Sequence, residues 1–269
     1  MRRGPIQEVW AESRPSLRPE RMAGLRTNPP LIISGSVLSF WLICSREGLG
    51  MNEVFGSPNQ KQMQIKGEHL ARLLSRDPRY CSHGRGVQIV DHGPQAVDLV
   101  ESLAQLIGAS GCEMVPKELC DEFRSELEAR GLRTDVIGHF IGNSDAINKA
   151  RTALATKPLP ADLSVLIIDS NSPGELVRDF AKVSMLHGVL PPIGSVMRGI
   201  SRPGFGMVAK DRSGRPVATA GAVKSRHPDH PMADMVQWGQ LATVPDRQGE
   251  GIARALSLIH ISEPTRLQV

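Results

Sequence analysis

The sequence predicts a mixed α/β protein with two folded parts, a small α/β domain over residues 64–158 and an α+β domain with a mixed sheet over residues 159–255. Two patterns indicate this. Strand-like runs alternate with amphipathic helices in the first part, and the second part reads as a strand, a helix and three more strands. An apolar fraction of 40% over 269 residues is ordinary for a folded chain.

The first domain repeats a strand followed by a helix. Val87 to Val90 is a β-type run, and Pro94 opens a helix with apolar residues on one face. Cys112 to Val115 is strand-like, and residues 117–130 predict a second helix that Gly131 ends. The same patterns predict a strand at 135–141 and a helix from Ser144 to about Leu154. The sequence assigns no role to this domain.

The second domain begins with a β-type run at residues 163–168. Ser172, Pro173 and Glu175 then predict a capping box at the start of a helix, which Gly188 ends. The apolar face of this helix comprises Leu176, Val177, Phe180, Val183 and Leu186. Three strands follow, at 206–210, 216–223 and 235–244, and a turn between the first two favours an antiparallel hairpin.

A glycine-bearing turn follows the last strand. After Val244 the chain reads P-D-R-Q-G-E-G-I-A-R-A-L, in which Gly249 and Gly251 allow a ligand close to the backbone and a helix starts at Ile252. A helix N-terminus presents about four unpaired N–H groups and a partial positive charge, so it holds a phosphate without any cationic side chain. A dinucleotide fold and a P-loop are excluded, because G-x-G-x-x-G and G-K-[ST] are absent and the preceding strands are antiparallel.

The stretch from Leu241 to Leu256 resembles the acetyl-CoA signature of the GNAT superfamily of N-acetyltransferases. Gln248, Gly251 and Ala253 fill its core, [Q/R]-x-x-G-x-[G/A]. The predicted order of elements is also that of the GNAT fold, and the resemblance spans roughly residues 162–255. It implies a GNAT-like acyl-CoA transferase fold, C-terminally incomplete, that transfers acetyl from acetyl-CoA to the primary amine of a small molecule or peptide.

The resemblance also implies which residues hold the co-substrate acetyl-CoA. The end of the last strand lines the pantetheine arm, which pairs with the strand edge, and the following loop surrounds the pyrophosphate. No metal ion is implied. The residues along the pantetheine arm are Leu241, Ala242, Thr243 and Val244, and those around the pyrophosphate are Gln248, Gly249, Gly251, Ile252, Ala253 and Arg254.

The catalytic acid and base are not identified. Acetyl transfer to an amine needs a group that takes a proton and a donor that stabilises the oxyanion. In resembling enzymes a Tyr beyond the fifth strand often protonates the thiolate, and this chain has no such region. The strand at 235–244 contains no carboxylate, and we interpret Asp229, His230 and Asp234 before it as residues of a solvated loop. The alternatives are a non-catalytic acyl-CoA-binding or sensing module, or an incomplete gene product with no function.

Both ends of the chain are set apart from the domains. Residues 1–50 contain Arg but no Lys and show no apolar periodicity, so we predict no helix or strand there and interpret residues 1–63 as a disordered or spurious leader. The segment Leu256 to Arg266, LSLIHISEPTR, resembles the translation of a transposon-end adapter used in sequencing libraries. We therefore expect residues 256–269 to be an adapter-derived tail, and the chain as written to be an inactive fragment.

Composition excludes several classes of function. Most of the net charge of +4 arises in residues 1–50, and the chain has only ten aromatic residues, which argues against a nucleic-acid groove. The four cysteines form no C-x-x-C pair, so we expect a reduced, cytoplasmic chain without a zinc site. The apolar stretch Leu31 to Cys44 is shorter than the roughly 20 residues of a membrane span. A signal peptide remains an alternative reading of it, and the oligomeric state is open.

Overall fold

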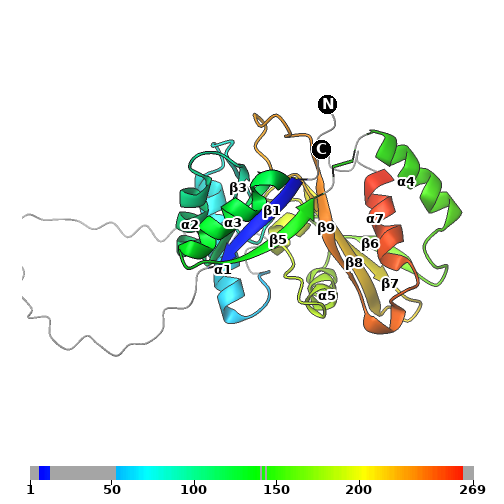
Figure 1. The fold of residues 1–269 in the computed structure, drawn as a ribbon. Coiled ribbons are helices and arrows are strands. Elements are labelled where there is room, and N and C mark those ends of the chain that lie inside the picture. The colour runs from blue at the N-terminus through cyan, green and yellow to red at the C-terminus, as the bar shows by residue number, and fades with distance from the viewer. Residues whose placement is uncertain (1–5, 13–52, 140, 143, 263–269) are drawn as a thin grey trace, which may run out of the picture.

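The computed structural model describes residues 6–12, 53–139, 141–142 and 144–262, which form two β-sheets with helices packed on both (Figure 1). The mixed α/β class is confirmed. The first half comprises β1 (Ile6–Glu12), α1 (Pro58–Leu73), β2 (Tyr80–Cys81), β3 (Gln88–Asp91), α2 (Ala96–Ile107), β4 (Ala109–Pro116), the 3₁₀ helix η1 (Lys117–Leu119), α3 (Cys120–Ala129) and β5 (Arg133–His139). The second half comprises α4 (Ser144–Thr156), β6 (Ser164–Ile167), α5 (Gly174–Met185), α6 (Gly194–Met197), β7 (Gly204–Lys210), β8 (Pro216–Val223), β9 (Gln237–Thr243), η2 (Pro245–Arg247) and α7 (Ile252–Ser262). Helix α4 was predicted as part of the first domain, but it packs on α7 (Figure 1).

The sheet of the first half is mixed and has the strand order β2-β3-β4-β1-β5. Its one parallel pair is β3 with β4, and α2 connects these two strands. The predicted apolar face of α2 is buried, with Val100 fully inaccessible to solvent. The predicted face of α3 is buried at Phe123 and Leu127, whereas Leu119 lies in η1 and is exposed, because the α-helix begins only after it.

The sheet of the second half is antiparallel and has the order β6-β7-β8-β9. Helices α5 and α7 cover its two faces (Figure 1). Phe180 of α5 packs on Val208 in one buried cluster, and Leu256 of α7 packs on Ala218 in another. A Cβ atom at Gly206 would lie only 3.0 Å from the Phe180 ring, so a glycine is needed for α5 to pack this closely.

The structure differs from the expected leader at two places. Residues 6–12 form β1, which pairs antiparallel with β4 on one side and with β5 on the other. Residues 53–63 include the start of α1, and Phe55 is buried in the second half. The prediction that residues 1–50 contain no strand is therefore wrong for residues 6–12, and the boundary at residue 63 divides a continuous helix. The expectations for residues 13–50, with Leu31 to Cys44, lie outside the described residues.

The capping boxes also differ from the prediction. Ser172 does not cap α5, because its hydroxyl donates to Asp169 Oδ1 over 3.0 Å and accepts from the Asp169 N–H. A capping box is found instead at α1, where the Ser57 hydroxyl accepts from the Gln60 N–H and the Gln60 side chain accepts from the Ser57 N–H. Ser57 and Ser172 both favour a helix start, but at Ser172 the Asp169 carboxylate competes for the hydroxyl.

Helix α7 continues beyond the point where we expected the tail to begin. It ends at Ser262, and Leu256 and His260 on one of its faces are buried. The His260 ring stacks on Phe205 with 4.7 Å between ring centroids. Residues 256–262 are thus part of the packed second half. No helix within the described ranges has both the length and the apolar character needed to cross a bilayer.

Candidate functional site

The predicted phosphate-binding loop lies between β9 and α7. Its two glycines have left-handed backbone conformations, with φ of 85° at Gly249 and 80° at Gly251, which other residues rarely adopt. Within the described residues, none of the N–H groups from Gly249 to Arg254 donates to another backbone group, and Ala255 is the first to do so. The loop and the first turn of α7 thus present consecutive unpaired N–H groups, as an anion site requires.

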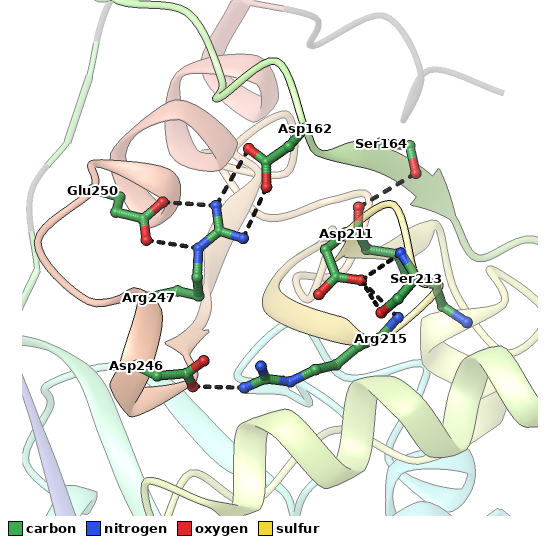
Figure 2. A network of polar contacts seen from close by, with 9 residues as sticks. Asp162, Ser164, Asp211, Ser213, Arg215, Asp246, Arg247 and Glu250 are labelled. Carbon is green, nitrogen blue, oxygen red and sulfur yellow. Dashed lines mark hydrogen bonds and ion pairs between the residues drawn. The ribbon is translucent and has the colours of Figure 1, made fainter.

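Ion pairs hold this loop in place (Figure 2). The Arg247 guanidinium bonds Glu250 within the loop at 2.6 and 2.7 Å, and it bonds Asp162, which precedes β6, at 2.9 Å. These two carboxylates raise the pKa of Arg247. Arg215, the residue before β8, pairs with Asp246 over 2.6 Å. The loop is therefore anchored to other elements at Asp246 and Arg247 and braced internally at Glu250, and Arg247 is already committed to carboxylates rather than to a ligand.

Strand β9 carries an irregularity just before the loop. Thr219 of β8 faces Ala242 and Gly221 faces Gly239, so β9 contains one residue more than β8 between these positions. Gln240 lies in this bulge with φ of 51°. A β-bulge interrupts the ladder and bends the strand. In the described residues β9 pairs only with β8, so no strand pairs with its other edge there.

The residues predicted for the pantetheine arm lie at the end of this edge. Ala242, Thr243 and Val244 are buried, whereas Leu241 is 37% exposed. The Thr243 carbonyl accepts from two side chains, the Gln248 amide at 3.2 Å and the His187 ring at 2.7 Å. Gln248 therefore ties the loop back to the strand, and His187, which sequence reasoning missed, does the same from the end of α5.

The residues predicted for the pyrophosphate are brought together around the start of α7. Gln248, Gly249 and Arg254 are exposed, whereas Ile252 packs into the core beneath them. Lys157, just after α4, also reaches this point, because a Cβ atom on Gly251 would lie 3.9 Å from its Nζ. The sequence gives no indication that Lys157 lies near Gly251, because the predicted second domain separates the two residues along the chain.

The three polar residues before β9 have different environments. The side chains of Asp229 and Asp234 are exposed to solvent, as expected. His230 is only 6% exposed, and interpreting it as part of a solvated loop is wrong. Its Nδ1 accepts from the Met232 N–H, so its Nε2 carries the proton and donates to Asp91 of the first half over 3.0 Å. His230 thus joins the two halves.

A buried polar cluster in the first half was not anticipated. Glu113 on β4 is inaccessible to solvent and lies 2.5 Å from His83 Nε2 and 2.6 Å from the Arg226 guanidinium. Burial alone would raise the pKa of Glu113, but His83 and Arg226 lower it to about 2. Cys81 lies beside them, and ligand atoms of Cys81, His83 and Glu113 lie within 4.8 Å of one another. This spacing suits a metal ion, but an arginine already holds the Glu113 carboxylate.

The contact between the two halves follows one electrostatic rule. In each cross-half ion pair found among the described residues, the carboxylate belongs to the first half and the cation to the second. Two of these carboxylates, Glu68 and Glu113, are buried, which excludes water from the pairs. The pairs are Glu53 with Arg198, Glu68 with Arg202, Glu113 with Arg226, and Asp91 with His230.

Comparison with known proteins adds no family to this geometry. No family model matches the chain, and no curated protein is similar to it at a significant level.

Proposed function

We propose that residues 159–255 bind acetyl-CoA in the manner of a GNAT-like domain and that the protein is a CoA-dependent N-acyltransferase for a primary amine. One observation carries the proposal. The unpaired N–H groups from Gly249 to Arg254 follow directly on a strand with a free edge. A phosphate-bearing ligand with amide groups along its arm is complementary to both features.

The loop backbone would hold the pyrophosphate. The partial positive charge at the start of α7 favours an anion there. Arg247 contributes indirectly, because its pairs with Asp162 and Glu250 keep the loop in one conformation before the ligand arrives. A preorganised loop loses little conformational freedom on binding, which raises affinity.

The free edge of β9 would hold the pantetheine arm. Strand residues advance by about 3.3 Å each, so the chain from Gly239 to Val244 covers roughly 16 Å. A pantetheine arm of about that length would place the thioester at the bulge around Gln240 when the pyrophosphate lies in the loop. At the bulge the backbone N–H and C=O groups no longer point along the regular ladder direction. An N–H group in this region would polarise the thioester carbonyl.

The reaction is an acyl transfer. The lone pair of the deprotonated amine attacks the thioester carbon, the C–S bond breaks, and the thiolate takes a proton. Overall, acetyl-CoA and an ammonium group give CoA thiol, an N-acetyl amide and one proton. The described residues place neither an Asp nor a Glu on β9, so the proton acceptor is a water or a group outside this strand.

Calorimetric titration with acetyl-CoA tests the proposal. Gly251→Val forces a β-branched residue into a left-handed conformation and places methyl groups where the phosphate would approach, so we expect affinity to fall at least tenfold. Gly214→Val is the matched control, because φ is 83° there too but the turn lies outside the loop. Equal affinity of the wild type and Gly251→Val would remove the loop from the binding site.

The absence of a carboxylate from β9 favours one alternative, a module that binds acyl-CoA without turnover. Thiol release from acetyl-CoA in the presence of primary amines separates the two. Release that depends on the amine supports the transferase. Tight binding with no release for any amine supports the binding module.

A further inference from the structure

A cavity lies between the two halves, beside β9. Its volume is about 320 Å³, which is at the small end of the range for ligand sites. Both halves contribute to it, with β4 and the end of β5 on one side and the start of β9 on the other. The lining residues are His83, Arg85, Met114, Ile137, Gly138, His139, Ile141, Arg226, Met235, Val236, Gln237, Trp238 and Gly239.

The charged groups in this cavity are all basic. Among the described lining residues there are two arginines and two histidines but neither Asp nor Glu. Glu113 lies beneath them, and this single carboxylate is shared by His83 and Arg226. A cavity with this composition favours a ligand with a negative group.

Among the buried atoms of the lining residues, one donor and one acceptor stand out because they lack hydrogen-bond partners in the described structure. The Arg226 side chain is 4% exposed, and its Nε–H has no acceptor because only the terminal nitrogen bonds Glu113. On β9, Gln237 Oε1 has no donor. Buried polar groups are normally satisfied, so an unpaired donor and an unpaired acceptor on residues that line one cavity favour a ligand with both an acceptor and a donor.

The remaining wall is apolar. It consists of aliphatic and thioether side chains with one indole, from Met114, Ile137, Ile141, Met235, Val236 and Trp238. Such a surface favours a hydrocarbon side chain.

The cavity also lies next to the point where the acyl group would arrive. Trp238 and Gly239 line it, and the next residue is Gln240 in the bulge of β9. An amine bound in the cavity therefore approaches the strand at the position where the proposed function puts the thioester.

We propose that this cavity is the acceptor site and that it takes an α-amino acid with an aliphatic side chain. The Arg226 Nε–H binds the carboxylate of this amino acid, and Gln237 Oε1 accepts from its amine. The role of this amino acid as acetyl acceptor rests on the proposed function. The acceptor site also gives the first half a role, because residues 64–158 supply one wall of it.

Binding to the full chain tests this with a set of compounds that differ by one group. The probes are L-leucine, 3-methylbutylamine, which lacks only the carboxylate, and 4-methylpentanoate, which lacks only the amine. We expect leucine to bind at least tenfold more tightly than either, because each analogue leaves one buried group unpaired. Binding of 3-methylbutylamine as tight as that of leucine, or no binding of leucine, overturns the assignment.

A substitution on β9 sharpens the test. Gln237→Leu removes the acceptor without removing a charge, so we expect leucine affinity to fall to that of 4-methylpentanoate while 4-methylpentanoate itself is unchanged. Gln105→Leu, the same change at an exposed position of α2, is the control and leaves both affinities as they were. Unchanged leucine affinity in Gln237→Leu overturns the role of Gln237 and with it the proposed orientation.

A separate titration with acetyl-CoA keeps this inference distinct from the proposed function. Acetyl-CoA binding without discrimination among the three probes refutes the acceptor site alone. Leucine binding without acetyl-CoA binding refutes the proposed function and leaves an amino-acid site of another kind.

Discussion

The two halves of the molecule are stabilised in different ways. The first half buries ionised side chains, with Glu68 and Glu113 almost inaccessible to solvent. The second half buries a sheet of small residues such as Ala218 and Ala220 under closely packed helices. The cations that neutralise the buried carboxylates come from the second half. The first half therefore depends on the second electrostatically, whereas the candidate cofactor site of the second half is built from its own backbone.

The largest expected effect concerns the first sheet. A chain that begins at Met51 lacks β1 and leaves the facing edges of β4 and β5 unpaired. Each lost hydrogen bond contributes about 0.5–1.5 kcal/mol, so we expect a loss on the order of 5 kcal/mol for the first half. Thermal unfolding followed by circular dichroism measures it. An unchanged melting temperature would instead support the sequence-based interpretation of residues 1–63 as a leader.

The next effect tests the electrostatic dependence itself. Arg226→Met leaves the buried Glu113 carboxylate without its arginine and with only His83 and the Cys81 thiol beside it, and we expect a loss of about 3–5 kcal/mol. Adding Glu113→Leu to Arg226→Met should restore much of it, because no buried charge is then left unpaired. Denaturant unfolding of the single and double variants measures both. Arg215→Met, which breaks an exposed pair in the second half, serves as the control and should cost less than about 1 kcal/mol.

As the pH is lowered, the second half should lose folding stability at a higher pH than the first half. Burial lowers the pKa of His260 from 6.5 to about 4, so its contribution is complete above pH 6.5 and is lost between pH 6.5 and 4, where only the unfolded state takes up the proton. The slope is up to about 1.4 kcal/mol per pH unit. The pKa of Glu113 is lowered from 4.5 to about 2, so its contribution is lost only between pH 4.5 and 2.

Melting temperatures at a series of pH values test this order. His260→Phe keeps a ring against Phe205 and should remove the slope between pH 6.5 and 4. His69→Phe, at an exposed site on α1, should leave the slope in place. A slope that survives in His260→Phe would assign the acid sensitivity to another group.

The smallest effect compares the two serines before α1 and α5. Ser57→Ala removes a formed capping box and should cost about 1 kcal/mol. Ser172→Ala removes only a turn bond to Asp169 and should cost less. Denaturation midpoints of the two variants measure the difference, and an equal or larger cost at Ser172 would show that the turn matters more than the helix cap.

The elements that could be predicted from the sequence are those with a local pattern. Helices such as α2 and α5 were predicted because apolar residues recur on one face, and the loop at Gly249 and Gly251 was predicted because a local motif defines it. Helix α1 was missed because the residues it buries include Gln64 and Glu68, which carry no apolar pattern.

The missed site residues share one physical cause. The partners of α1 lie far along the chain, with Gln64 bonding the Pro191 carbonyl at 2.7 Å and Glu68 bonding Arg202 at 2.8 Å. Glu113 and Arg226 are likewise separated by 113 residues. No local pattern announces such pairs, because each side chain alone looks like an ordinary surface group. Only the packing of one half on the other removes them from water.

The long separation of these pairs has a consequence for synthesis on the ribosome. Glu113 is made 113 residues before Arg226, the cation that neutralises it. At a translation rate of roughly 5 to 20 residues per second, this delay lasts about 6 to 23 seconds. During that time the nascent first half has no arginine partner for a carboxylate that its own core would enclose. We therefore expect the burial of Glu113 in its final, neutralised form to come only after Arg226 has been made.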